Sequence, residues 1–119
     1  MDWLYDKNGN AELFIYGNRF ISKRGENLGW LYNGKIYGLK NGHHLGWFED
    51  GVIYDLNNCV FAFLRDASGH LPYRPGLSGT PGIPGIPGSP GIPGFSGTYA
   101  RPAYSSRWST LTIKDFFDK

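Results

Sequence analysis

A fourfold internal repeat occupies residues 1–67 and constrains the fold more than any other feature. The repeats begin at apolar residues spaced by 16, 16 and 17 positions, which are Leu4, Phe20, Ile36 and Ile53. Later in each repeat an aromatic residue recurs, giving the series Phe14, Trp30, Trp47 and Phe63. The residue before that aromatic is Leu13, Gly29, Gly46 or Ala62. Repeats dictate how neighbouring elements pack, so they indicate the fold more strongly than any single element does.

Turn signals recur about every eight residues in the same region. Pairs such as Asn33-Gly34 and Asp50-Gly51 favour type I′ hairpins, in which both central residues need positive φ. Asp6 and Asp55 precede other turns and are predicted to form Asx turns. The runs between turns are aromatic and β-branched and too short for helices, which predicts eight or nine antiparallel strands. Since an open meander leaves two exposed edges, we expect residues 1–67 to close into a shallow all-β barrel with pseudo-fourfold symmetry.

Equivalent residues of the four repeats should form rings around the barrel axis. One ring is the aromatic series above, and a second contains Tyr5, Ile21, Tyr37 and Tyr54. Two interpretations stay open. The rings fill the core, or one mouth of the barrel leaves them exposed as an apolar dish. The candidate contacts for a ligand or partner are Phe14, Trp30, Trp47, Phe63, Tyr5, Tyr37 and Tyr54.

Two segments of the repeat carry a family resemblance. These are residues 28–30, which read Leu-Gly-Trp, and residues 45–51, which read Leu-Gly-Trp-Phe-Glu-Asp-Gly. Residues 1–67 resemble the bacterial four-fold β-flower family, with departures at Leu13 and at the Asn57-Asn58 turn. The resemblance implies a square barrel of four hairpin petals. It implies no established activity and no catalytic residues.

Behind the repeat, after a linker at residues 68–75, lies a strict Gly-X-Y tract over residues 76–97. Glycine recurs at every third position through seven triplets, and five triplets carry proline at the third place. This is the collagen signature, because only glycine fits at the axis of three wound polyproline II chains. One interpretation is a short triple helix, hence a homotrimer with a collagen-like stalk. The other is a single-chain polyproline II spacer, favoured by the shortness of the tract and its isoleucines.

Residues 98–119 are predicted as an extended loop followed by a short C-terminal docking helix. Thr112 can cap the helix, with Asp115 three residues on, while Ile113, Phe116 and Phe117 share one face. Two turns of helix do not persist alone, so this segment needs a surface to dock on. That surface is the barrel of this chain or of a neighbouring protomer, or else another protein. The candidate anchors are Trp108, Phe116 and Phe117.

Charge and composition exclude several classes of function. The net charge is +2 and the basic residues are scattered, which argues against nucleic-acid binding. The adjacent His43 and His44 point to opposite strand faces, and the single Cys59 cannot form an internal disulfide, so no metal site or cofactor is expected. No apolar run is long enough for a transmembrane segment and no signal peptide is visible, which makes the cytoplasm the default compartment.

No nucleophile, acid–base pair or phosphate loop stands out, and no catalytic residue is predicted. The sequence therefore predicts a non-enzymatic interaction or scaffold module, trimeric if the tract winds into a triple helix. The alternative is a binder of a small hydrophobic ligand, peptide or membrane lipid at the aromatic mouth of the barrel.

Overall fold

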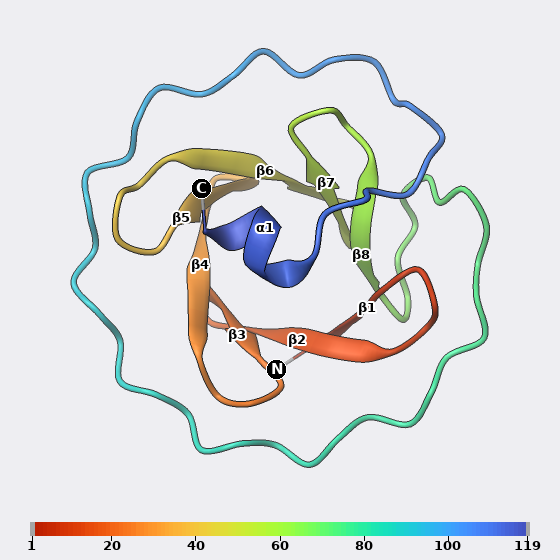
Figure 1. Cartoon of the computed structure of the whole chain (residues 1–119), viewed down its shortest axis with the longest axis horizontal. Coiled ribbons are helices and arrows are strands. Elements are labelled where there is room, and N and C mark those ends of the chain that lie inside the picture. Colours follow the sequence, from red (N-terminus) through yellow and green to blue (C-terminus); the bar gives the residue numbers. More distant parts are fainter. Residues whose placement is uncertain (1, 119) are drawn as a thin grey trace.

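The computed structural model describes residues 2–118, which form one closed antiparallel barrel and a short helix. The strands are β1 (Asp2–Tyr5), β2 (Ala11–Tyr16), β3 (Arg19–Ser22), β4 (Asn27–Tyr32), β5 (Lys35–Gly38), β6 (His44–Glu49), β7 (Val52–Asp55) and β8 (Val60–Leu64), and the helix is α1 (Ile113–Phe117). Each strand pairs with its neighbour in sequence, and β1 pairs with β8 to close the barrel. The predicted all-β meander and its closure are confirmed (Figure 1).

The hairpins form for the local reasons that the sequence indicates. Asn33 and Gly34 have φ of 54° and 75°, and Asp50 and Gly51 have 52° and 81°, as a type I′ turn requires. At the opposite ends of the strands, the side chain of Asp6 accepts hydrogen bonds from the backbone N–H groups two and four residues ahead. Asp55 and Ser22 do the same in their own repeats. Both carboxylates are therefore turn residues.

An irregularity in strand register occurs at the same place in all four repeats. The extra residue lies in β2, β4, β6 and β8, at Glu12, Leu28, Leu45 and Phe61, opposite the steps Leu4/Tyr5, Phe20/Ile21, Ile36/Tyr37 and Ile53/Tyr54 of the partner strands. A bulge bends its strand and increases the local twist. Four equivalent bulges bend the sheet equally in each quarter, which is how strands of only four to six residues close into a ring.

The Gly-X-Y tract lies on the outside of the barrel, within a longer segment that runs around it (Figure 1, green to blue). Both sequence interpretations, a stalk and a spacer, set the tract apart from the barrel, and the structure differs from both. Residues 72–107 divide into four nine-residue units, 72–80, 81–89, 90–98 and 99–107, which align on prolines at equal spacing: Pro75, Pro84, Pro93 and Pro102. We call residues 72–107 the belt.

Belt and barrel are in register, one nine-residue unit to each repeat. The backbone N–H of Ser78 donates to Gly9 O at 2.8 Å, and that of Ser96 donates to Gly42 O at 2.9 Å. Ser105 N–H lies 3.4 Å from Asn58 O in the fourth repeat. The equivalent residue of the second unit is Pro87, which has no N–H to donate.

The length of the belt agrees with the size of the barrel. Nine residues in an extended polyproline II geometry span about 28 Å, so four units span about 110 Å. The molecule measures 36 Å across in two directions, and a circle of that width has a perimeter of about the same length. One unit thus covers one quarter of the perimeter.

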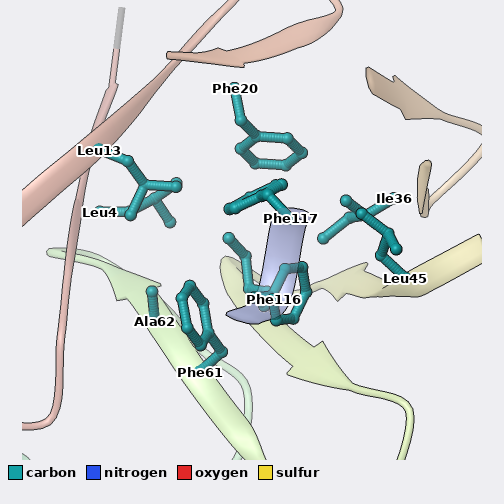
Figure 2. Close-up of a cluster of buried hydrophobic side chains, with 10 residues drawn as sticks. Leu4, Leu13, Phe20, Ile36, Leu45, Phe61, Ala62, Phe116 and Phe117 are labelled. Atoms are coloured by element: carbon teal, nitrogen blue, oxygen red, sulfur yellow. The ribbon is translucent and has the colours of Figure 1, made fainter. Parts of the chain in front are cut away.

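The barrel wall is apolar on both faces. Leu4, Phe20 and Ile36 point inward and pack around Phe116 and Phe117 of α1 (Figure 2), and Ile53 belongs to the same buried cluster. A second cluster, which includes Tyr5, Tyr54 and Phe63, packs against Leu77, Tyr104 and Trp108 of the chain that surrounds the barrel. All four residues of β3 and all four of β7 are accordingly buried. The back half of the chain supplies the cover for both faces.

Candidate functional site

The barrel interior is filled by the C-terminal segment of the same chain. We call residues 111–118 the plug. Phe116 is stacked on Phe61 with ring centroids 4.4 Å apart, and Phe117 lies 6.0 Å from Phe20. Thr112 caps α1, its hydroxyl accepting from the N–H of Asp115 at 3.1 Å. The predicted anchors Phe116 and Phe117 thus lie inside their own barrel (Figure 2).

Small residues at one position of the second, third and fourth repeats make room for the plug. A Cβ added to Gly29 would lie 3.0 Å from Cδ1 of Phe117, and one added to Gly46 would lie 3.0 Å from Cζ of Phe116. Ala62 occupies the same position in the fourth repeat and packs in the same cluster. The absence of larger side chains here is what allows two phenyl rings to enter.

The predicted aromatic rings face outward and are buried, and belt side chains contact four of them: Tyr37, Tyr54, Trp47 and Phe63. Their exposed fractions are at most 6%, for Phe14, Trp30, Trp47, Phe63, Tyr5, Tyr37 and Tyr54. They do not form an open aromatic dish at a barrel mouth, because the inner face is taken by Leu4, Phe20 and their equivalents. Adjacent residues of a strand alternate between faces, which places these rings outside.

Aromatic side chains of the belt stack on the outer ring. Phe95 lies flat on Tyr37, with centroids 4.2 Å apart and planes inclined by 10°. Tyr104 is nine residues further on and meets Tyr54 edge to face at 6.2 Å. Burial raises the pKa of the Tyr37, Tyr54 and Tyr104 phenols. These ring contacts bury apolar surface between belt and barrel, in addition to the backbone hydrogen bonds that set the register.

Two arginines fasten the first and fourth units of the belt. Arg74 lies over the ring of Phe63 at 5.8 Å and donates to Ala67 O at 2.8 Å. Arg101 lies 4.7 Å from the ring centre of Tyr54 and forms an ion pair with Glu49 at 3.1 Å. At the equivalent positions the two middle units carry isoleucine, and Ile83 and Ile92 are 64% and 62% exposed.

His44 joins the belt to the third repeat. Its Nδ1 accepts a hydrogen bond from Tyr99 N–H at 3.0 Å, and its Nε2 lies 2.9 Å from Gly46 O. Because Nδ1 accepts, the ring is neutral and carries its proton on Nε2. Burial lowers the pKa of His44 below its usual value, which stabilises this neutral form.

The belt closes on itself over β8. Trp108 packs edge to face on Tyr73 at 5.3 Å, which brings the end of the belt to its beginning. Val60 N–H donates to Arg107 O at 3.0 Å, and Ser109 N–H donates to Val60 O at 2.7 Å. The predicted anchor Trp108 therefore fastens the belt to the outside of the barrel.

Three open grooves surround the plug at the barrel mouth. The first, about 300 Å³, lies towards the β1–β2 turn and is floored by Leu13, Phe61 and Ala62. The second, about 530 Å³, lies towards the β3–β4 turn, and the third, about 300 Å³, lies towards the β5–β6 turn. Within residues 2–118, no group of three or more His, Cys, Asp or Glu could hold a metal ion, and no helix is long and apolar enough to cross a membrane.

The model of the 4-fold beta flower protein family matches residues 2–117. The chain belongs to this family. The match takes in belt and plug, whereas the sequence motifs carried the resemblance over residues 1–67 alone. No curated protein and no solved structure matches the chain.

Sequence reasoning missed the belt residues that hold this β-flower together. These are Ser78, Ser96 and Ser105, whose N–H groups set the register, and the arginines Arg74 and Arg101. The available signal was that these residues are separated by multiples of nine positions, 18 and 9 for the serines and 27 for the arginines. It extends beyond the Gly-X-Y tract at both ends.

Proposed function

We propose that this β-flower is a non-enzymatic interaction module whose displayed surface is the belt. One observation carries the proposal. Seven large hydrophobic side chains are exposed among the described residues, and five belong to the belt: Tyr73, Ile83, Ile86, Ile92 and Tyr99. Exposed apolar residues that gather on one segment mark a protein-binding surface.

The belt has the properties of a preorganised ligand for another protein. Residues 75–100 contain no charged residue, so recognition there depends on apolar contact and backbone hydrogen bonds. The barrel holds the extended chain in place, so binding costs little conformational entropy. Extended proline-rich segments dock in aromatic-lined grooves of partner proteins. The partner that fits is a protein with such a groove.

The oligomeric state follows from the same argument. A triple helix would require residues 76–97 to leave the barrel, which would take Phe95 away from the ring of Tyr37 and expose that ring to water. We therefore propose a single-chain belt in place of a trimeric stalk. The expected mass in solution is 13.3 kDa, and a trimer that disappears when residues 76–97 are replaced by a flexible linker would contradict this.

The displayed surface is tested by a charge substitution in the middle units. Ile83→Arg with Ile92→Arg places arginine where units one and four already carry it, and the fold should tolerate the change. Proteins captured from a lysate by the wild-type chain should be lost from this variant and kept by Thr80→Arg, an exposed control on the same belt. Equal capture by both variants would exclude the belt as the binding surface.

A further inference from the structure

The barrel wall of the second repeat carries hydrogen-bond donors for peptide carbonyl groups. Arg19 Nη1 donates to Pro87 O at 2.9 Å, and Asn27 Nδ2 donates to Gly88 O at 3.0 Å. Arg19 is 7% exposed and forms no ion pair among residues 2–118. A buried guanidinium needs acceptors, and those of Arg19 are the side chain of Asn27 and the carbonyl groups of the belt. This arginine therefore binds a neutral backbone and no carboxylate.

The wall of the third repeat supplies an aromatic surface and a hydrogen-bond acceptor. Phe95 of the belt stacks on Tyr37 with ring centroids 4.2 Å apart, and Tyr32 lies 5.8 Å from the same ring. Beside this surface, Gly42 O accepts from Ser96 N–H at 2.9 Å. Domains that recognise polyproline II segments also bind them on aromatic surfaces. We call the wall residues of these two repeats the wall site: Arg19, Asn27, Tyr32, Tyr37 and Gly42.

The wall site makes few demands on the sequence of the segment that lies on it. The hydrogen bonds above use peptide N–H and C=O groups of the belt, and Phe95 supplies the ring. Ile83 and Ile92 are 64% and 62% exposed. A Cβ added to any of three neighbouring belt glycines would meet nothing within 4 Å: Gly85, Gly88 and Gly91. Another polyproline II segment with one aromatic side chain would therefore fit the same site.

The two ends of the belt have fastenings that its middle lacks. Arg74 and Arg101 hold the first and fourth units, and Trp108 packs on Tyr73 where the ends meet. At the positions of these arginines, the two middle units carry exposed isoleucines. Segments with few buried contacts open locally at a low free-energy cost. Residues 81–98 can therefore move away from the wall as a loop while both ends of the belt stay attached.

We propose that the wall site binds a proline-rich polyproline II segment of another protein in exchange for the middle of the belt. The incoming segment is uncharged, carries one aromatic residue and lies along the path of residues 85–97. Its carbonyl groups accept from Arg19 and Asn27, and its ring lies on Tyr37. The belt is a tethered ligand that keeps the site closed. Because the site lies under the belt, it does not depend on the exposed face invoked in the proposed function.

The probe is a fluorescently labelled peptide of residues 85–97, titrated into the full-length chain and followed by anisotropy. The tethered belt competes at an effective concentration of about 1 mM, so the wild-type chain should bind the peptide weakly. In the chain, Phe95→Ala with Ser96→Pro removes the stacking ring and the register N–H of the belt and leaves the wall intact. This belt variant should bind at least ten-fold more tightly than wild type. Equal affinity for both chains, or no saturable binding to the variant, would overturn the proposal.

Matched controls locate the bound peptide. A peptide with Phe95→Ala lacks the ring that lies on Tyr37 and should bind the belt variant at least ten-fold more weakly. Asn27→Ala, added to the belt variant, removes a donor to the ligand carbonyl and should weaken binding several-fold. Lys40→Ala, at an exposed site on another turn, should leave binding unchanged. Binding that survives both the peptide change and Asn27→Ala would place the peptide elsewhere and contradict the proposal.

The mass of the belt variant identifies the source of the segment. Without peptide, the variant should keep the near-UV circular dichroism of wild type and a mass of 13.3 kDa. Dimers that exchange belts would mean that a second copy supplies the segment, which would overturn the assignment to another protein. If the double substitution unfolds the chain, Phe95→Ala alone keeps the register hydrogen bond and should gain affinity at least three-fold. No gain in this folded variant would also overturn the proposal.

Discussion

The belt and the plug cover opposite faces of the same barrel wall, and they are held in different ways. The belt is long, and its contacts are spread over four equivalent places, each a backbone hydrogen bond, a ring contact or an arginine. The plug is short and depends on two buried phenyl rings, Phe116 and Phe117. A distributed attachment tolerates the loss of one contact, whereas a concentrated attachment does not. The substitutions below test this difference, in order of decreasing expected effect.

Truncation of the plug should be the most damaging single change. Phe116→Ala removes a ring that is 1% exposed and leaves a cavity at the centre of the barrel. Such changes cost about 3–5 kcal/mol. Urea denaturation measures the loss, and Ile92→Ala on the outside of the belt should change stability by less than about 0.5 kcal/mol. Similar losses for both variants would remove the contrast between plug and belt.

Glycine should be required on the barrel and dispensable on the belt. A Cβ at Gly46 would collide with the carbonyl oxygen of Tyr54 and crowd Phe116, so Gly46→Ala should cost about 1–3 kcal/mol. A Cβ at Gly85 meets nothing within 4 Å, so Gly85→Ala should stay within about 0.5 kcal/mol of wild type. A triple helix makes the opposite prediction for Gly85, because only glycine fits at its axis. The denaturation midpoints of the two variants decide between these.

The register of the belt predicts a smaller, position-specific effect. Ser96→Pro removes the N–H that donates to Gly42 O and copies the residue found at the equivalent position 87. The expected loss is about 1 kcal/mol, the net value of one backbone hydrogen bond. Ser96→Ala keeps the N–H and should be close to neutral in the same denaturation experiment. Equal losses of stability for Ser96→Pro and Ser96→Ala would show that the Ser96 hydroxyl, and not its backbone N–H, stabilises the belt at this position.

Acid should loosen the belt at the third repeat. Since the pKa of His44 is lowered in the folded chain, the unfolded chain binds more protons just below the usual value of 6.5. The stability contributed by neutral His44 is complete above pH 6.5 and is lost as the pH falls below it. The positive charge of Lys35 also disfavours protonation of His44, so it lowers the pKa of His44 in the same direction as burial does.

The pH effect is measured by urea denaturation between pH 7.5 and 5. His44→Asn, which mimics the belt-binding Asn27 of the second repeat, should flatten the stability profile. A wild-type profile with the same slope as the variant would show that His44 does not cause the acid sensitivity.

The barrel could be predicted from sequence because its signals are local and repeated. Pairs such as Asn33-Gly34 set the hairpins, and the spacing of Trp30 and Trp47 sets the size of each repeat. The faces could not be assigned, because both sides of the strands are apolar. The set of equivalent residues that contains Phe20 and the set that contains Tyr37 are alike in sequence. They are told apart only by their contacts, because Phe20 packs against the plug and Tyr37 against the belt.

The belt could not be predicted because its strongest pattern has a different, more familiar meaning. Glycine at every third position is the mark of collagen, and it obscures the longer period of nine. That period is plain only when Pro75, Pro84, Pro93 and Pro102 are aligned with the four repeats of the barrel. The contacts between Ser78 or Ser96 and their turns are long-range, and no local propensity encodes them.

The measurement that tests the central claim most directly is the nuclear Overhauser effect between the rings of Phe95 and Tyr37. Their centroids lie 4.2 Å apart, so strong cross-peaks are expected in the full-length chain. An isotope-filtered spectrum of mixed labelled and unlabelled chains detects only contacts between chains. The same cross-peaks should be absent from it, because the belt packs on the barrel of its own chain. Absent cross-peaks, or cross-peaks that appear only between chains, would contradict the account.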